Sequence, residues 1–139
     1  MNHDELQQQT NAHYEDFPFD FLTEEDEQNI EQLQPPAFFR FTETYLRPGS
    51  KVAEIGCGPG RATLFMSNRG IDLLAVDISP ASLSLAKRRA PNCKFLQATN
   101  LDLPLPDEAF DAVVSDGVIH HTPDAYTSFC ENARILRPG

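Results

Sequence analysis

Cysteine is scarce in this 139-residue sequence, and its spacing excludes two common uses. Cys57, Cys93 and Cys130 are odd in number and form no C-x-x-C pair, so we expect neither a disulfide framework nor a bound metal such as zinc. A reducing, cytoplasmic location is the expectation. Cys57 is expected to be a small buried residue, because no basic neighbour adjoins it to activate a thiolate.

Long apolar runs are also missing. No run approaches the roughly 18 apolar residues of a membrane-spanning helix, so no membrane partner is expected. The N-terminus is acidic and polar, whereas a secretory signal begins basic and continues apolar. We therefore expect no signal peptide.

Positive charge is absent from residues 1–39, which hold ten acidic residues and no Lys or Arg. Residues 40–139 hold eleven of each sign, so the net charge of −10 arises in this leader. Phosphate binding depends largely on Lys and Arg, so we expect no nucleic-acid partner. The leader also has aromatic residues between His13 and Phe21, which a purely solvated tail would lack.

Residues 51–77 carry the most informative pattern in the chain. A short buried strand over 51–55 is followed by alternate glycines, which let the backbone turn sharply and approach a ligand closely. A helix over 61–69 would point unpaired N–H groups above that turn. Asp77 ends the next strand, where its carboxylate fits the two hydroxyls of a ribose. The pattern predicts a nucleoside-binding half-site. The three glycines are Gly56, Gly58 and Gly60.

The glycine spacing separates two classes of nucleoside ligand. The dinucleotide fingerprint G-x-G-x-x-G needs a glycine where this chain has Arg61, so an NAD-dependent oxidoreductase is the least favoured alternative. With Glu54 two residues before the first glycine, residues 54–60 instead resemble motif I of the class I S-adenosylmethionine-dependent methyltransferases. Three further segments continue the resemblance in order: 74–80 (LAVDISP), 103–111 (LPLPDEAFD) and 115–124 (SDGVIHHTPD).

The resemblance covers about residues 46–139 and is nearest to the methyltransferases of small molecules, quinones and lipids. It implies that Glu54 orients the loop and the methionyl ammonium of S-adenosylmethionine, that Asp77 holds the ribose and that Ile78 packs on adenine. Thr99 stands where the family usually has an Asp that accepts from the adenine amine, and a neutral hydroxyl is a weaker acceptor. The implied cofactor-binding residues are Glu54, Gly56, Cys57, Gly58, Gly60, Asp77, Ile78, Thr99, Asn100 and Ser115.

Two adjacent histidines are the candidates for the chemistry. Methyl transfer from a sulfonium is an in-line displacement, so a base is needed only if the acceptor must lose a proton. His120 follows the last expected strand at the mouth of the site and is the candidate base or substrate-positioning residue. The alternative for His120 is a loop histidine bonded to the backbone. His121 and Tyr14 are candidate substrate or lid contacts.

Alternating elements predict an α/β fold with a parallel sheet and right-handed crossovers. The resemblance implies a Rossmann-like sheet in strand order 3-2-1-4, flanked by helices, with the ligand at the carboxyl ends of strands one and four. We expect an acidic N-terminal arm or lid over 1–35 and a cofactor-binding domain over 36–139. Helices are expected over 36–46, 61–69, 80–89 and 123–136, and strands over 51–55, 72–76, 93–97 and 110–115.

A repeated tetrapeptide bears on how the sheet continues. The sequence Leu-Arg-Pro-Gly at 46–49 leads into the first strand and recurs at 136–139. In the resembling family, strands five to seven follow this point, so the chain resembles the N-terminal part of a methyltransferase. Strand four would then be an open edge, which a second copy or a partner chain would cover.

The sequence therefore predicts an S-adenosylmethionine-dependent methyltransferase that acts on a small-molecule acceptor. The main alternative is a non-catalytic module that binds S-adenosylmethionine or S-adenosylhomocysteine and serves in interactions. The resemblance to the family predicts an enzyme. The alternatives of an active and an inactive 139-residue chain both stay open at this point.

Overall fold

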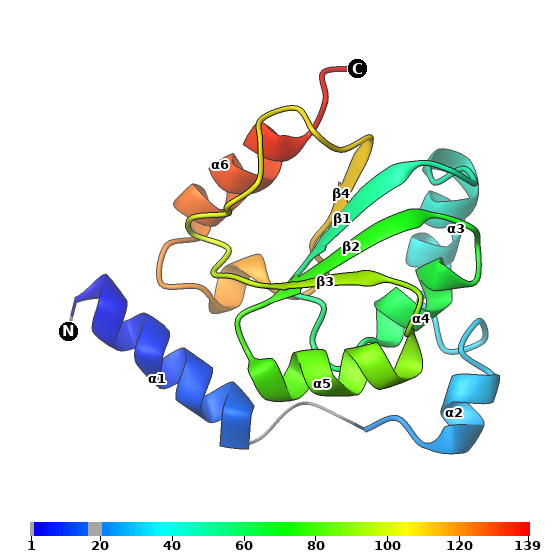
Figure 1. Cartoon of the computed structure of the whole chain (residues 1–139), viewed down its shortest axis with the longest axis horizontal. Coiled ribbons are helices and arrows are strands. Elements are labelled where there is room, and N and C mark those ends of the chain that lie inside the picture. Colours follow the sequence, from blue (N-terminus) through cyan, green and yellow to red (C-terminus); the bar gives the residue numbers. More distant parts are fainter. Residues whose placement is uncertain (1, 17–20) are drawn as a thin grey trace.

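The structure is a computed structural model that describes residues 2–16 and 21–139 (Figure 1). In these residues four parallel strands form one sheet in the order β3-β2-β1-β4, which confirms the predicted order 3-2-1-4. The strands are β1 (Lys51–Ile55), β2 (Asp72–Asp77), β3 (Lys94–Gln97) and β4 (Ala112–Val114).

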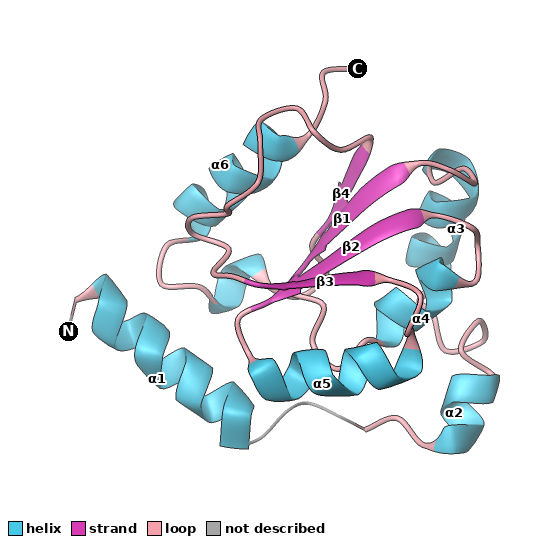
Figure 2. Ribbon diagram, viewed as in Figure 1, coloured by secondary structure: helices cyan, strands magenta, loops and turns pink. Residues whose placement is uncertain are grey.

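The two faces of the sheet are covered by different helices (Figure 2). On one face, Val52 and Leu73 pack in a buried cluster with Phe65, and Ala75 packs with Leu83. On the other face, Ala53 packs in a buried cluster with Ile135 of the last helix. The first face is covered by α3 (Pro36–Tyr45), α4 (Arg61–Ser67) and α5 (Pro80–Arg89), and the second by α6 (Ala125–Ile135).

Local signals in the sequence fix where the helices begin. Ser79 accepts a hydrogen bond from Ser82 N at 3.1 Å and caps α5, whose first residue is Pro80. Asp124 caps α6 in the same way through Thr127 N at 3.0 Å, so the helix expected from 123 begins at Ala125. These caps mark the starts of α5 and α6, whose expected boundaries lie within two residues of those observed.

The acidic leader contains two helices that the sequence analysis did not predict. α1 (His3–Asp16) contacts α5, and α2 (Glu24–Gln28) begins at a capping box between Thr23 and Asp26. The leader has few apolar residues, so it offers little helical periodicity to read. Residues 17–20 of its aromatic stretch lie outside the described residues. The division of the chain at residue 35 stays a prediction.

The outer edge of β4 is partly occupied. Phe110, just before the strand, forms an isolated parallel bridge with Leu136, and Arg137 N donates to Phe110 O at 2.9 Å. β4 itself is shorter than the expected 110–115. A partner that covers the rest of this edge stays a prediction.

Gly60 offers a test of how the turn after β1 packs on α5. Its φ is +94°, and an added Cβ would lie 2.9 Å from the Cα of Ala86. Gly49 also has a positive φ, +82°, but nothing lies within 4 Å of an added Cβ. We expect Gly60→Ala to lower the free energy of unfolding by about 1 kcal/mol or more beyond the loss in Gly49→Ala, because α5 must shift. Urea unfolding measures both, and equal losses would show that the packing is not tight.

Candidate functional site

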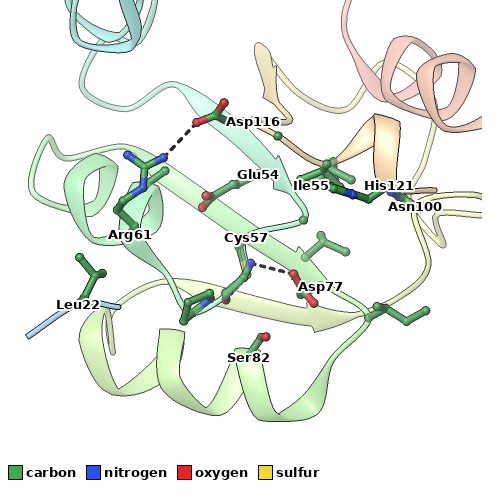
Figure 3. Close-up of a pocket in the computed structure, with 18 of the residues that line it drawn as sticks. Leu22, Glu54, Ile55, Cys57, Arg61, Asp77, Ser82, Asn100, Asp116 and His121 are labelled. Carbon is green, nitrogen blue, oxygen red and sulfur yellow. Dashed lines mark hydrogen bonds and ion pairs between the residues drawn. The ribbon is translucent and has the colours of Figure 1, made fainter. Parts of the chain in front are cut away.

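A cavity of about 630 Å³ opens at the carboxyl ends of the strands, within the size range of ligand sites (Figure 3). The glycine turn that follows β1 forms its floor. Gly56 N and Cys57 N donate to Val76 O at 2.7 and 2.9 Å, so the turn is bonded to β2. Val118 occupies the space that a side chain at Gly56 would need, whereas a Cβ at Gly58 would enter open space. The backbone at Gly58 is therefore open to close approach by a ligand.

Asp77 lies at the end of β2 and is held by the backbone. Its Oδ2 accepts from Gly58 N at 2.8 Å and its Oδ1 from Ser79 N at 2.9 Å. A carboxylate can accept about four hydrogen bonds, so Asp77 can hold the glycine turn and ligand hydroxyls together. Asp77 ends the second strand, as expected from the sequence, and its contact with a ribose stays a prediction.

Glu54 is a buried acid at the end of β1, with 4% of its surface exposed. Burial raises the pKa of its carboxyl to about 8, opposed by a hydrogen bond from Thr63 Oγ1 to Oε2 at 2.6 Å and by the charge of Arg61. Among the described residues, Oε1 receives no hydrogen bond. Because a buried carboxylate is stabilised by an opposite charge, the site fits a cationic group such as an ammonium.

Arg61 is a feature of the site that the sequence analysis missed. Its guanidinium contacts Asp116 at 3.1 Å and donates to Gln34 Oε1 at 2.9 Å. Glu54 lies between this ion pair and Asp77 (Figure 3). A basic residue in the first turn of a helix opposes the helix dipole, and this was the signal that could have indicated a fixed partner for Arg61.

Four residues of the leader segment also line the cavity. None was predicted individually, because an arm without recognised helices gives no direction for its side chains. They form one wall of the cavity, and Phe21 and Leu33 on this wall are exposed. The four are Phe21, Leu22, Asp26 and Leu33.

The predicted site residues are divided by the structure. Thr99 Oγ1 accepts from Leu101 N at 3.2 Å, and Gly60 packs on Ala86 below the turn, so neither lines the cavity. The Ser115 hydroxyl is buried with no hydrogen bond among the described residues. Tyr14 belongs to α1, and its side chain lies outside what the structure describes. The predicted residues that line the cavity are Glu54, Gly56, Cys57, Gly58, Asp77, Ile78, Asn100 and His121.

The two histidines differ in position. Both belong to the short 3-10 turn η1 (Ile119–His121), with their ring centroids 4.0 Å apart. Both histidines are exposed, but His121 lines the cavity and His120 does not. The position that we expected for His120 is therefore held by its neighbour, and a catalytic role for either stays a prediction.

Cys57 lines the cavity as a neutral thiol. Burial raises its pKa above the ordinary value, and the charges of Glu54 and Asp77 act in the same direction. Within the described residues, no group of three His, Cys, Asp or Glu side chains could hold a metal ion. No helix in the same residues is long and apolar enough to cross a membrane.

A search against known families decides the family of this chain. Residues 53–139, more than half of the chain, match the model described as a methyltransferase domain. The chain belongs to the methyltransferase domain family. This confirms the resemblance drawn from the glycine turn and the three segments after it, and the Rossmann-like sheet is that of S-adenosylmethionine-dependent methyltransferases.

Individual relatives of this methyltransferase domain have different substrates in their names. A demethylmenaquinone methyltransferase of Tropheryma whipplei (strain Twist) is 34% identical over 96 residues, covering 66% of this chain and 39% of that protein. A probable tRNA methyltransferase 9B of Mus musculus is 38% identical, covering 67% of this chain and 21% of that protein. The chain thus spans less than two fifths of the length of these curated relatives.

Among solved structures, a SAM-dependent methyltransferase of Thermotoga maritima, described as a possible histamine N-methyltransferase, has the same fold. It is 26% identical with a TM-score of 0.65, and the match covers 94% of this chain and 58% of that one.

Proposed function

We propose that this methyltransferase domain binds S-adenosylmethionine in the cavity and takes part in transfer of its methyl group to a small-molecule acceptor. The observation that carries the proposal is the placement of two carboxylates, Glu54 and Asp77, around one glycine turn. Family membership supports the cofactor, which supplies a methyl group activated by attachment to a sulfonium. The residues of the cavity fit this group by their chemistry.

Each carboxylate has a distinct role in this proposal. Glu54 neutralises the methionyl ammonium, because it lines the cavity and its Oε1 receives no hydrogen bond from the described residues. Asp77 accepts hydrogen bonds from the ribose hydroxyls while it keeps Gly58 in place. Ile78 and Asn100 lie near the end of β2 and the segment after β3, where they would contact the adenine.

The charge around the cavity supports a small-molecule acceptor over RNA. Asp26 and Asp116 lie on its wall, and Arg61 is already paired with Asp116. The leader that forms the other wall belongs to a segment with ten acids and no Lys or Arg, which repels a polyanion. The apolar rim of Phe21 and Leu33 favours an acceptor with an apolar or aromatic part.

Turnover is tested with S-adenosylmethionine that carries a labelled methyl group. The purified chain is incubated with a panel of phenols, quinols, amines and carboxylates, and both S-adenosylhomocysteine and labelled product are measured. The proposal predicts equal amounts of both for at least one acceptor. Saturable binding with no turnover on any acceptor would support the non-catalytic binding module instead.

His121 is proposed to position the acceptor, because it lines the cavity and His120 does not. On an acceptor that is methylated, we expect His121→Ala to lower the transfer rate about 3- to 10-fold, the worth of one hydrogen bond. S-adenosylhomocysteine affinity should stay unchanged. His120→Ala is the matched control, and a larger loss in the control would restore His120 as the candidate.

A further inference from the structure

Arg89 is a charged side chain in a buried position. It is the last residue of α5, and only 2% of its side chain is exposed. Its Nε contacts Glu27 Oε1 at 2.6 Å, its Nη1 donates to Pro59 O at 2.7 Å and its Nη2 donates to Leu22 O at 3.4 Å. A buried guanidinium is costly unless its donors are satisfied, and here each of its three nitrogens has a hydrogen-bond partner.

The partners of Arg89 belong to two different segments of the chain. Pro59 is in the glycine turn, and Leu22 is in the leader segment; both line the cavity. Glu27 belongs to α2, which follows Leu22 closely in the chain. Arg89 does not line the cavity itself. The guanidinium of Arg89 therefore joins the glycine turn to the leader segment, which are far apart in the sequence. It does so from outside the cavity.

The Pro59 carbonyl is a sensitive point of the turn. It precedes Gly60, which caps the start of α4 and has a φ of +94°. An added Cβ at Gly60 would lie 2.9 Å from the Cα of Ala86 in α5, so the turn packs tightly on that helix. A hydrogen bond from Arg89 fixes the peptide between Pro59 and Gly60 relative to α5. Because Gly58 lies directly before Pro59, this bond also limits the freedom of the backbone that faces the cavity.

Two further side-chain contacts hold the other end of the leader segment (residues 21–34). Arg61, at the start of α4, donates to Gln34, and Arg69, just after α4, contacts Glu31 at 3.1 Å, so both contacts attach the end of this segment to α4. Its beginning, around Leu22 and Glu27, is joined to the turn through Arg89. Leu22 also packs against the buried cluster that contains Phe65, so loss of the Arg89 contacts would loosen the segment at Leu22 and Glu27 without detaching it.

We infer that Arg89 is a positioning residue for the cofactor: it holds the glycine turn and the leader segment at the separation that the ligand requires. The inference rests on the proposed function, because it predicts an effect on cofactor affinity. The role is indirect, through Pro59, Leu22 and Glu27, and needs no contact between Arg89 and the ligand.

The first test is Glu27→Gln, which removes the charge that contacts Arg89. Glu24→Gln on the same helix is the matched control, because Glu24 is exposed. We expect Glu27→Gln to raise the Kd for S-adenosylhomocysteine about 3- to 10-fold and to speed amide exchange in residues 21–34. Exchange in β1 and β2 should stay unchanged. Glu24→Gln should match the wild type in all three measurements.

Arg89→Lys tests the guanidinium itself. Lysine keeps the charge but lacks the planar fork that reaches three partners, so we expect a loss of affinity at least as large as that of Glu27→Gln. Gly49→Ala controls for a purely structural loss, because it strains the backbone at the opposite end of β1. All variants are compared at a temperature at which each is fully folded.

The outcomes separate this inference from the proposed function. Unchanged affinity in both Glu27→Gln and Arg89→Lys, with a wild type that binds, overturns the role of Arg89 alone. Equal losses of affinity in Gly49→Ala and Arg89→Lys also overturn it. A folded wild type that does not bind S-adenosylhomocysteine overturns the proposed function, and the positioning role with it.

Discussion

Asp77→Ala is expected to weaken S-adenosylhomocysteine binding about 10- to 150-fold, which corresponds to about 1.5–3 kcal/mol. The substitution removes the acceptor for the ribose hydroxyls and also releases Gly58 N and Ser79 N, which Asp77 holds at 2.8 and 2.9 Å. Both effects act on the same ligand, because Gly58 is the part of the turn that is open to the cavity. Calorimetric titration measures the Kd.

The control for this prediction is Asp102→Ala. Asp102 is an exposed acid that does not line the cavity, so its loss changes the net charge by the same amount. We expect the control to bind as the wild type does. If folded Asp77→Ala bound as tightly as the wild type, Asp77 would be removed from the site and the ribose assignment would be wrong.

S-adenosylhomocysteine binding is expected to tighten as the pH rises from 6 to 8, by up to about tenfold per unit. Burial raises the pKa of Glu54 to about 8, so at lower pH the carboxyl is protonated and must lose its proton to neutralise an ammonium. Titrations in two buffers of different ionisation enthalpy should show release of about one proton on binding at pH 7. Glu54→Gln should bind weakly, with no such dependence.

The same carboxyl affects the stability of the ligand-free protein in the opposite direction. Its pKa in the folded state, about 8, is above the ordinary value of 4.5, so the folded state holds the proton more tightly than the unfolded chain. The contribution of Glu54 to the stability of the folded state is fully present below pH 4.5 and is lost as the pH rises through 8. Glu54→Gln should lack this decline. An affinity that does not vary with pH in the wild type would contradict the assigned role of Glu54.

The parts of the fold that follow from local signals could be predicted from the sequence. Strand β1, the turn at Gly56 and Gly58 and the acid Asp77 depend on residues close together in the chain. The caps Ser79 and Asp124 similarly indicate where α5 and α6 begin. The strand order came from the family resemblance, and the sheet confirms it.

The remaining features depend on partners far apart in the sequence. Arg61 and Asp116 are 55 positions apart, and Arg89 and Glu27 are 62 apart, so neither pair leaves a local pattern. The 3-10 turn that contains His120 and His121 determines which of the two reaches the cavity, and no periodicity in the sequence predicts the direction of this turn. The segments 103–111 and 115–124 indicated the family but not which of their side chains reach the cavity.

The measurement that tests the central claim most directly is calorimetry of the purified chain with S-adenosylmethionine and, separately, with S-adenosylhomocysteine. The proposed function predicts saturable binding of both with one site per chain, a Kd in the micromolar range and loss of that binding in Asp77→Ala. Absence of binding by a chain that circular dichroism shows to be folded would contradict it, and the glycine turn would then serve only as scaffold.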